Sequence, residues 1–201
     1  MESLLYTGVL IAGFIIGKVI RKYITVKYSI VTSKFPYYEL ITAIAFCMNA
    51  FFMGFSLRFI EFCSFSLFIL TIGFIDFYFK IIPNVIVLLF AIVNMFFAVL
   101  NSIVCSKSIL NSLTGVVSAS AILFVVSFLS NGSIGGGDIK FTAAAGIFLG
   151  AQLSILALAV AVLLAGVILP VLLLAKKVDK KDVIALGPFL AIGMYVAMLL
   201  L

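Results

Sequence analysis

The sequence has no histidine and only three cysteines among its 201 residues. Without histidine, neither a Ser–His nor a Cys–His nucleophile system can form, and all His-ligated metal sites are excluded. The cysteines Cys47, Cys63 and Cys105 are far apart and form no CxxC pair. This spacing supports neither a zinc cage nor a thioredoxin-like site. Any catalytic chemistry must therefore rest on other side chains.

Charge is also scarce. Only 10% of the residues are charged, seven of them acidic, whereas 66% are hydrophobic. A soluble domain of this length could not cover so much apolar surface with so few charges. The composition therefore predicts a polytopic membrane protein, and the net charge of +6 reflects loop cations rather than nucleic-acid binding. The first apolar run is followed, not preceded, by cations, so we expect a retained span rather than a signal peptide.

A span length of about 20 residues divides the chain into eight apolar segments. These segments are residues 4–20, 38–57, 62–79, 84–100, 109–129, 139–149, 151–175 and 184–201. The stretch 139–175 is too long for one span and too short for two, so we place a break near Gly150. We expect an all-α, polytopic transmembrane helix bundle of about eight helical segments, with an N-terminal part at 1–57 and a membrane core at 58–201.

The loop cations predict the orientation of the chain. If the amino terminus lies outside, ten cations face the cytoplasm and only Arg58 and Lys107 lie outside. The ten are Arg21, Lys22, Lys27, Lys34, Lys80, Lys140, Lys176, Lys177, Lys180 and Lys181. The positive-inside rule favours this orientation. It places Asp76 and Asp138 at the same cytoplasmic face, although neither aspartate was used to orient the chain.

These two aspartates are the candidate site. A charge at the centre of a membrane helix costs about 2.5–3.5 kcal/mol, so it requires a partner or a function. Asp138 follows a glycine-rich loop, residues 130–137, whose backbone could come close to a substrate. Two carboxylates that share a proton can act as an acid/base pair, one activating water and the other donating a proton. The same residues also allow a plainer interpretation, with Asp138 as a helix N-cap and Asp76 as an ion-pair partner of Lys80.

At this point the sequence resembles a known family. Residues 135–140 match the GxGD-x-K signature of the type IV prepilin peptidases, and Asp76 with the Ile-Pro-Asn at 82–84 matches that family's first aspartate and the turn after it. Residues 35–43 and 185–193 are similar to the segments that open the family's second span and its last span. The four motifs occur in the family's order and cover most of the chain.

The resemblance implies an aspartyl endopeptidase of the bacterial cytoplasmic membrane. Such enzymes remove the short basic leader of type IV prepilin or pseudopilin precursors at the cytoplasmic face, and proteolysis requires no cofactor. The resemblance assigns Asp76 and Asp138 as the catalytic pair. It gives Gly135 and Gly137 a role in shaping the substrate loop. The implied partners are the precursor and membrane lipids, with no nucleic acid.

Two further residues have possible supporting roles. Lys140 faces either the site or the lipid headgroups, and we favour the headgroups. The family counterpart of Glu39 lies in the amino-terminal region that is linked to methylation. Here Glu39 could also simply end a loop.

The chain departs from the bifunctional family members in one respect. Those members carry a larger first cytoplasmic loop with two CxxC pairs, and they also N-methylate the new amino terminus. Here the loop, residues 21–37, has 17 residues and no cysteine. Residues 1–57 thus resemble a shortened remnant of the methyltransferase-linked region. The short loop argues against methylation, and S-adenosylmethionine is a cofactor only if that activity is retained.

Other classes of function stay open from the residues alone. A small proton-coupled transporter could use Asp76 and Asp138 as a relay, but the sequence has no inverted repeat and no matched pair of broken helices. A non-catalytic scaffold would leave the two aspartates unexplained. Within the proteases, a presenilin-type relative is disfavoured because the last motif reads Gly-Pro-Phe rather than Pro-Ala-Leu. The GxxxG pair Gly146 and Gly150 predicts close helix packing, which could bring the helix of Asp138 against the third span.

Overall fold

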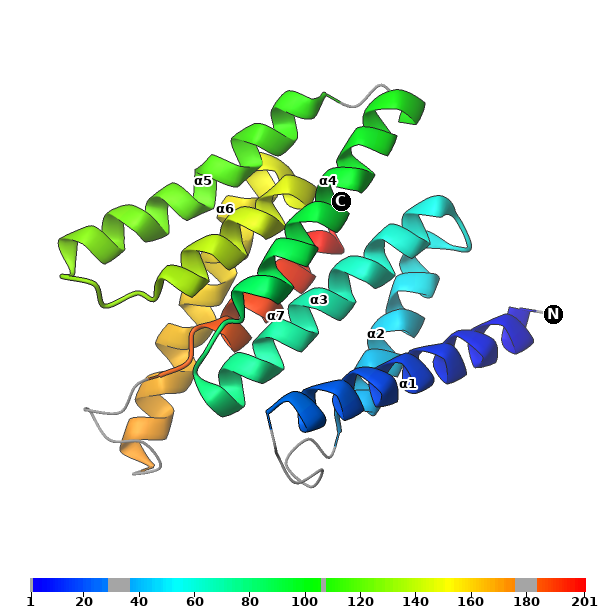
Figure 1. Ribbon diagram of the computed structural model, residues 1–201, viewed down its shortest axis with the longest axis horizontal. Coiled ribbons are helices and arrows are strands. Elements are labelled where there is room, and N and C mark those ends of the chain that lie inside the picture. The colour runs from blue at the N-terminus through cyan, green and yellow to red at the C-terminus, as the bar shows by residue number, and fades with distance from the viewer. Residues whose placement is uncertain (1, 29–36, 106–107, 176–183) are drawn as a thin grey trace. The chain divides into compact units, whose positions relative to one another are not determined.

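The computed structural model describes residues 2–28, 37–105, 108–175 and 184–201, and within them every regular element is an α-helix (Figure 1). The helices are α1 (Glu2–Lys27), α2 (Tyr38–Met53), α3 (Leu57–Phe79), α4 (Asn84–Cys105), α5 (Ile109–Leu129), α6 (Gly136–Leu174) and α7 (Gly187–Met198). Five of them are long and apolar enough to cross a membrane, while α2 and α7 are shorter apolar helices. The all-α polytopic bundle predicted from the composition is confirmed. The loop cations Lys34 and Lys107 and those at 176–181 lie outside the described residues.

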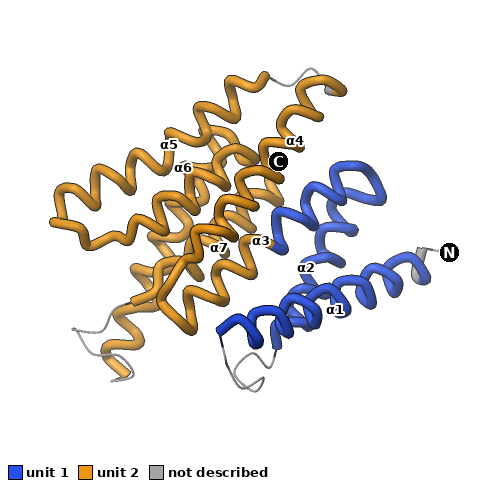
Figure 2. The backbone as a smooth tube through the Cα atoms, in the orientation of Figure 1, with its two compact units in different colours: residues 1–67 blue, residues 68–201 orange. Residues whose placement is uncertain are grey.

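The chain forms two compact units (Figure 2), residues 1–67 and residues 68–201. The division falls inside α3, whereas the sequence suggested a boundary after residue 57. Unit 1 contains α1, α2 and the first part of α3, and unit 2 contains the rest of α3 and the four helices that follow. Both candidate aspartates belong to unit 2.

In unit 1, two glycines allow α1 to lie directly against α2. A Cβ atom at Gly13 would lie 2.9 Å from the Cα atom of Ala43, and one at Gly17 would lie 2.9 Å from the Cα atom of Glu39. Small residues on a membrane helix permit such close backbone approach. The start of α2 is therefore fixed against the second half of α1.

In unit 2, α6 is broken at Gly150. This glycine has φ 73° and ψ −179°, which is far from helical geometry and strained for other residues. The chain doubles back there, so the two halves of α6 run side by side (Figure 1, yellow). Thr142 from the first half and Ser154 and Leu158 from the second line the same small cavity. The predicted break near Gly150, with a short first helix, is confirmed.

The first half of α6 packs on α4 and α5. Gly146 and Gly115 of α5 meet backbone to backbone, and neither position has room for a side chain. On α4, the Asn94 side-chain amide donates a hydrogen bond to the Ala144 carbonyl over 2.9 Å. The small face of this helix thus contacts α5, and the close packing predicted from the GxxxG pair is confirmed. The physical reason is that Gly115 supplies a second side-chain-free surface, so two small faces meet.

Three connections of unit 2 lie at one end of that unit. They are the turn from α3 to α4, the loop from α5 to α6, and the segment that leads into α7 (Figure 1, lower left). The carboxyl-terminal end of α4, the start of α5 and the carboxyl terminus lie at the opposite end. The helix ends that carry Asp76 and Asp138 therefore share one end of the unit.

Candidate active site

Asp76 lies in the last turn of α3, and the local sequence ends the helix just beyond it. Lys80 adopts a positive φ of 55°, and its N–H donates to the Asp76 carbonyl over 2.7 Å. Ile82 precedes Pro83, a position that disfavours helical geometry. The helix thus stops at Phe79, and the carboxyl group of Asp76 is held near the end of the span with only 6% of the residue exposed.

The Asp76 carboxylate has a specific backbone partner. Its Oδ2 atom accepts a hydrogen bond from the N–H of Gly187 over 2.8 Å. Gly187 is the first residue of α7, 111 positions away in the sequence. The free N–H groups and the dipole at a helix start stabilise a negative charge. Asp76 is therefore anchored by the amino-terminal end of another helix and not by Lys80.

Asp138 lies in the first turn of α6, after the glycine-rich loop. That loop uses two left-handed positions, Asn131 at φ 53° and Gly132 at φ 85°. The Ser127 hydroxyl closes it by donating to the Ile134 carbonyl over 3.0 Å. Gly135 then caps α6 with extended backbone geometry and no side-chain contact. The loop places Asp138 three residues into the helix, where a carboxylate can turn back to the exposed N–H groups.

The two oxygens of Asp138 differ. Oδ2 lies against the backbone of Gly135, where a Cβ atom would sit 3.1 Å from it. Oδ1 is buried and has no hydrogen-bond partner among the described residues. A buried, unpartnered carboxylate oxygen is costly, so such an atom requires an explanation such as a catalytic role or a bound water. Asp138 also lies within electrostatic range of Asp76.

The start of α6 is held against the turn that follows Asp76. A Cβ atom at Gly137 would lie 2.9 Å from the Cβ atom of Ile82. One turn along α6, the Lys140 ammonium donates to Asn84 Oδ1 over 3.2 Å. Residues far apart in sequence are thereby joined at one end of unit 2. Two carboxylates that interact in this way can share one proton and polarise a water molecule between them.

Two open cavities border this end. One, of about 420 Å³, lies beneath the glycine-rich loop and is lined by Phe124, Ser127, Phe128, Asn131, Gly132, Gly136 and Ile139. The other, of about 460 Å³, is an apolar groove on α4, α5 and α6, and the exposed Lys140 and Asn84 lie on its lining. Among the described residues, no group of three His, Cys, Asp or Glu side chains could hold a metal ion.

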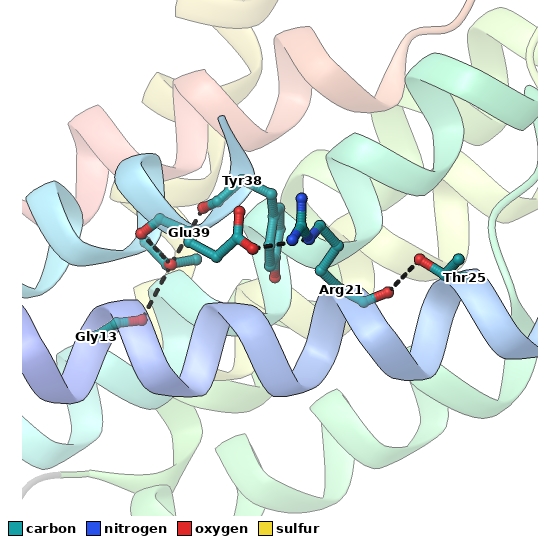
Figure 3. A network of polar contacts seen from close by, with 6 residues as sticks. Gly13, Arg21, Thr25, Tyr38 and Glu39 are labelled. Atoms are coloured by element: carbon teal, nitrogen blue, oxygen red, sulfur yellow. Dashed lines mark hydrogen bonds and ion pairs between the residues drawn. The ribbon is translucent and has the colours of Figure 1, made fainter. Parts of the chain in front are cut away.

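Glu39 lies in unit 1 and has a different environment (Figure 3). Its Oε1 atom lies 2.7 Å from Nε of Arg21 on α1, and the Glu39 side chain is only 7% exposed. The neighbouring Thr42 hydroxyl lies within hydrogen-bond distance of the Gly13 carbonyl, at 3.1 Å, so polar groups link α1 and α2 in two places. Glu39 therefore does not simply end a loop. It is the buried half of an ion pair between two helices.

Sequence reasoning missed two residues with specific contacts, Arg21 and Gly187. Arg21 was counted only as a topology-setting cation, because its partner lies 18 positions away on another helix. Gly187 was noticed only as part of the Gly-Pro-Phe segment. The one available signal was its position directly before a proline, which is typical of a helix start.

The fold and the site define the class: a polytopic helical membrane protein with paired acids at one end of its bundle. Comparison with known proteins then gives the family. The type IV leader peptidase family matches residues 63–170, more than half of the chain and a stretch that includes both aspartates. The chain belongs to this family.

One curated relative is the prepilin leader peptidase/N-methyltransferase of Bacillus subtilis (strain 168). It is 28% identical over 165 residues, which cover 82% of this chain and 65% of that protein. The chain thus spans slightly less than two thirds of the relative's length. No solved structure matches the chain.

Proposed function

We propose that this chain is an aspartyl endopeptidase that removes the basic leader from type IV prepilin or pseudopilin precursors. The observation that carries the proposal is the pairing of Asp76 and Asp138. These residues come from helices separated by more than fifty positions, yet they interact at one end of unit 2. An unpartnered, buried oxygen on Asp138 adds support, because a satisfied structural carboxylate would not leave it without a hydrogen bond.

The chemistry follows from two acids that hold one proton. The ionised carboxyl takes a proton from water, and the resulting hydroxide adds to the carbonyl carbon of the scissile peptide. The protonated carboxyl gives its proton to the leaving amide nitrogen, and the carbon–nitrogen bond breaks. The proton then passes from the first carboxyl to the second, which restores the starting state.

The substrate approaches from the cytoplasmic face in this proposal. The ten-to-two division of loop cations supports that orientation. The loop at 130–135 has no bulky polar side chain and a backbone that a peptide can approach closely. The cavity lined by part of this loop has the size of a small binding site. Gly135 and Gly137 shape this entrance. Lys140 is exposed at the apolar groove on α4, α5 and α6, and it contacts the lipid headgroups in this proposal.

Cleavage in this proposal uses neither metal nor cofactor, because two carboxyl groups polarise water directly. Methylation of the new amino terminus is not part of the proposal. The sequence suggested a loop at 21–37, but α1 continues to Lys27, so still fewer residues separate α1 from α2, which is little material for a binding pocket for S-adenosylmethionine.

The test is cleavage of a prepilin peptide by purified protein in detergent. We expect Asp76→Asn and Asp138→Asn each to lower kcat by about 10³-fold or more, while Gly166→Ala, at a helical position with open space around it, retains activity. Substantial cleavage by either folded aspartate variant would contradict the assignment.

Cleavage that is lost with a chelator would contradict the metal-free mechanism. A product heavier by one methyl group, formed with S-adenosylmethionine, would show that methylation is retained.

A further inference from the structure

The amino-terminal end of α7 presents one backbone donor to Asp76. Pro188 follows Gly187 and has no N–H, while the N–H of Leu190 donates to the Leu186 carbonyl over 3.1 Å inside the helix. The N–H of Gly187 has no helical acceptor at this position. It points instead to Asp76 Oδ2, at 2.8 Å in a buried setting.

The contact requires glycine on both helices. A Cβ atom at residue 187 would lie 2.6 Å from Oδ2 of Asp76 and 2.9 Å from its Cγ atom. One turn earlier on α3, a Cβ atom at Gly73 would lie 2.9 Å from the Cβ atom of Ala191. Positions 73 and 76 share a face of α3, and 187 and 191 share a face of α7. The two side-chain-free positions thus set how closely α7 approaches the carboxylate.

The direction of this hydrogen bond limits where a proton can be. A backbone N–H only donates, so Oδ2 of Asp76 must be an acceptor. Because an ionised or carbonyl oxygen accepts more strongly than a hydroxyl oxygen, this contact favours a shared proton on Oδ1 of Asp76 or on Asp138. When the proton is on Asp138, Asp76 is ionised, its charge is stabilised by the start of α7, and Oδ1 is the oxygen that takes a proton from water.

We propose that Gly187 is a positioning residue for the peptidase reaction. Its N–H fixes the orientation of the Asp76 carboxylate, which makes Asp76 the group that accepts the proton of the attacking water and Asp138 the group that protonates the leaving nitrogen. The Gly-Pro start of α7 is thereby part of the active site. The kinetic consequence rests on the proposed function, but the contact itself can be tested without substrate.

The first variant is Gly187→Ala, in which the added methyl group displaces the carboxylate. Because displacements of about 1 Å cost up to about 10²-fold in rate, we expect kcat to fall by about 10- to 100-fold. KM for a prepilin peptide should change by less than about twofold, since the contact does not bind substrate. Gly166→Ala is the matched control, a helical glycine with open space around it. A kcat within about twofold of wild type would overturn the proposal.

A second pair of variants guards against misfolding of Gly187→Ala. Gly73→Ala should push α7 away through Ala191 and lower kcat by about tenfold. The double variant Gly73→Ala with Ala191→Gly removes the obstructing methyl group and should restore kcat to within about threefold of wild type. Rescue supports the proposal. A folded Gly73→Ala protein with unchanged kcat, or a folded double variant without recovery, overturns it.

A spectroscopic measurement separates this proposal from the function itself. The sequence contains only four aspartates, Asp76, Asp138, Asp179 and Asp182. With carboxyl-labelled aspartate, the Asp76 signal is identified by its loss in Asp76→Asn. We expect this signal to shift in Gly187→Ala and to stay in place in Gly166→Ala. An unshifted signal overturns the contact. If the signal shifts in Gly187→Ala but the wild-type protein cleaves no prepilin, the proposed function is rejected and the contact stands.

Discussion

Glu39 of unit 1 and the two aspartates of unit 2 are held in different ways. In unit 1, Glu39 lies 2.7 Å from the guanidinium of Arg21. In unit 2, neither Asp76 nor Asp138 forms an ion pair with a described cation. Asp76 is anchored by one backbone N–H, and Asp138 has one oxygen with no hydrogen-bond partner. Glu39 of unit 1 is thus neutralised by a cation, whereas the two buried aspartates of unit 2 interact with each other.

This difference separates a structural acid from reactive ones. A buried carboxylate with a cation at hydrogen-bond distance is compensated, and removing either partner leaves an uncompensated charge. Two buried carboxylates near one another cannot both be ionised without a cost. Such an arrangement lowers stability, and proteins retain it where reactivity requires it. Under the proposed function, Glu39 supports the fold, whereas Asp76 and Asp138 are the groups available for chemistry.

The largest expected effect contrasts the two kinds of acid directly. Asp76→Asn and Asp138→Asn should abolish cleavage and leave the melting temperature equal or higher, because each relieves repulsion within the pair. Glu39→Gln should lower the melting temperature and reduce cleavage by only a few-fold. Thermal unfolding in detergent and a peptide cleavage assay measure both quantities. A lower melting temperature for either Asp variant, together with an unchanged melting temperature for Glu39→Gln, would reverse the comparison.

The second prediction tests the ion pair of unit 1. Arg21→Met leaves Glu39 buried without its cation and should lower the free energy of unfolding by about 3 kcal/mol. The double variant Arg21→Met with Glu39→Met should recover most of that loss, since no unpaired charge remains. Chemical denaturation in micelles provides the measurement. A double variant no more stable than the single one would show that the pair does more than neutralise Glu39.

The smallest effect concerns how the Asp138 helix is held in unit 2. In Gly137→Ala the new methyl group meets Ile82 at 2.9 Å, which should move the start of α6 and lower kcat by about tenfold. Combining it with Ile82→Gly removes the Cβ atom that the new methyl group meets and should restore much of the rate. If the single variant cleaves at the wild-type rate, the close contact at Gly137 does not position Asp138.

Much of the fold could be predicted from composition and hydropathy, because lipid requires every spanning segment to satisfy its own backbone. The helices, the break at Gly150 and the common end of the two aspartates follow from apolar run lengths and loop cations. The close packing of the GxxxG face is confirmed, but its partner helix could not be predicted from the sequence. Gly115 offers α5 the same kind of small surface, and hydropathy alone does not distinguish between neighbouring helices.

The sequence by itself determined the membrane class, the helical segments and the two aspartates as candidates, since these depend on local composition and on motifs contiguous in the chain. Only the tertiary structure decided which groups touch them. The Gly187 N–H reaches Asp76 across 111 positions, and Arg21 reaches Glu39 from another helix. The physical reason is that a hydrogen bond depends on distances of a few ångströms. Between segments remote in sequence, helix packing and side-chain-free glycines set those distances.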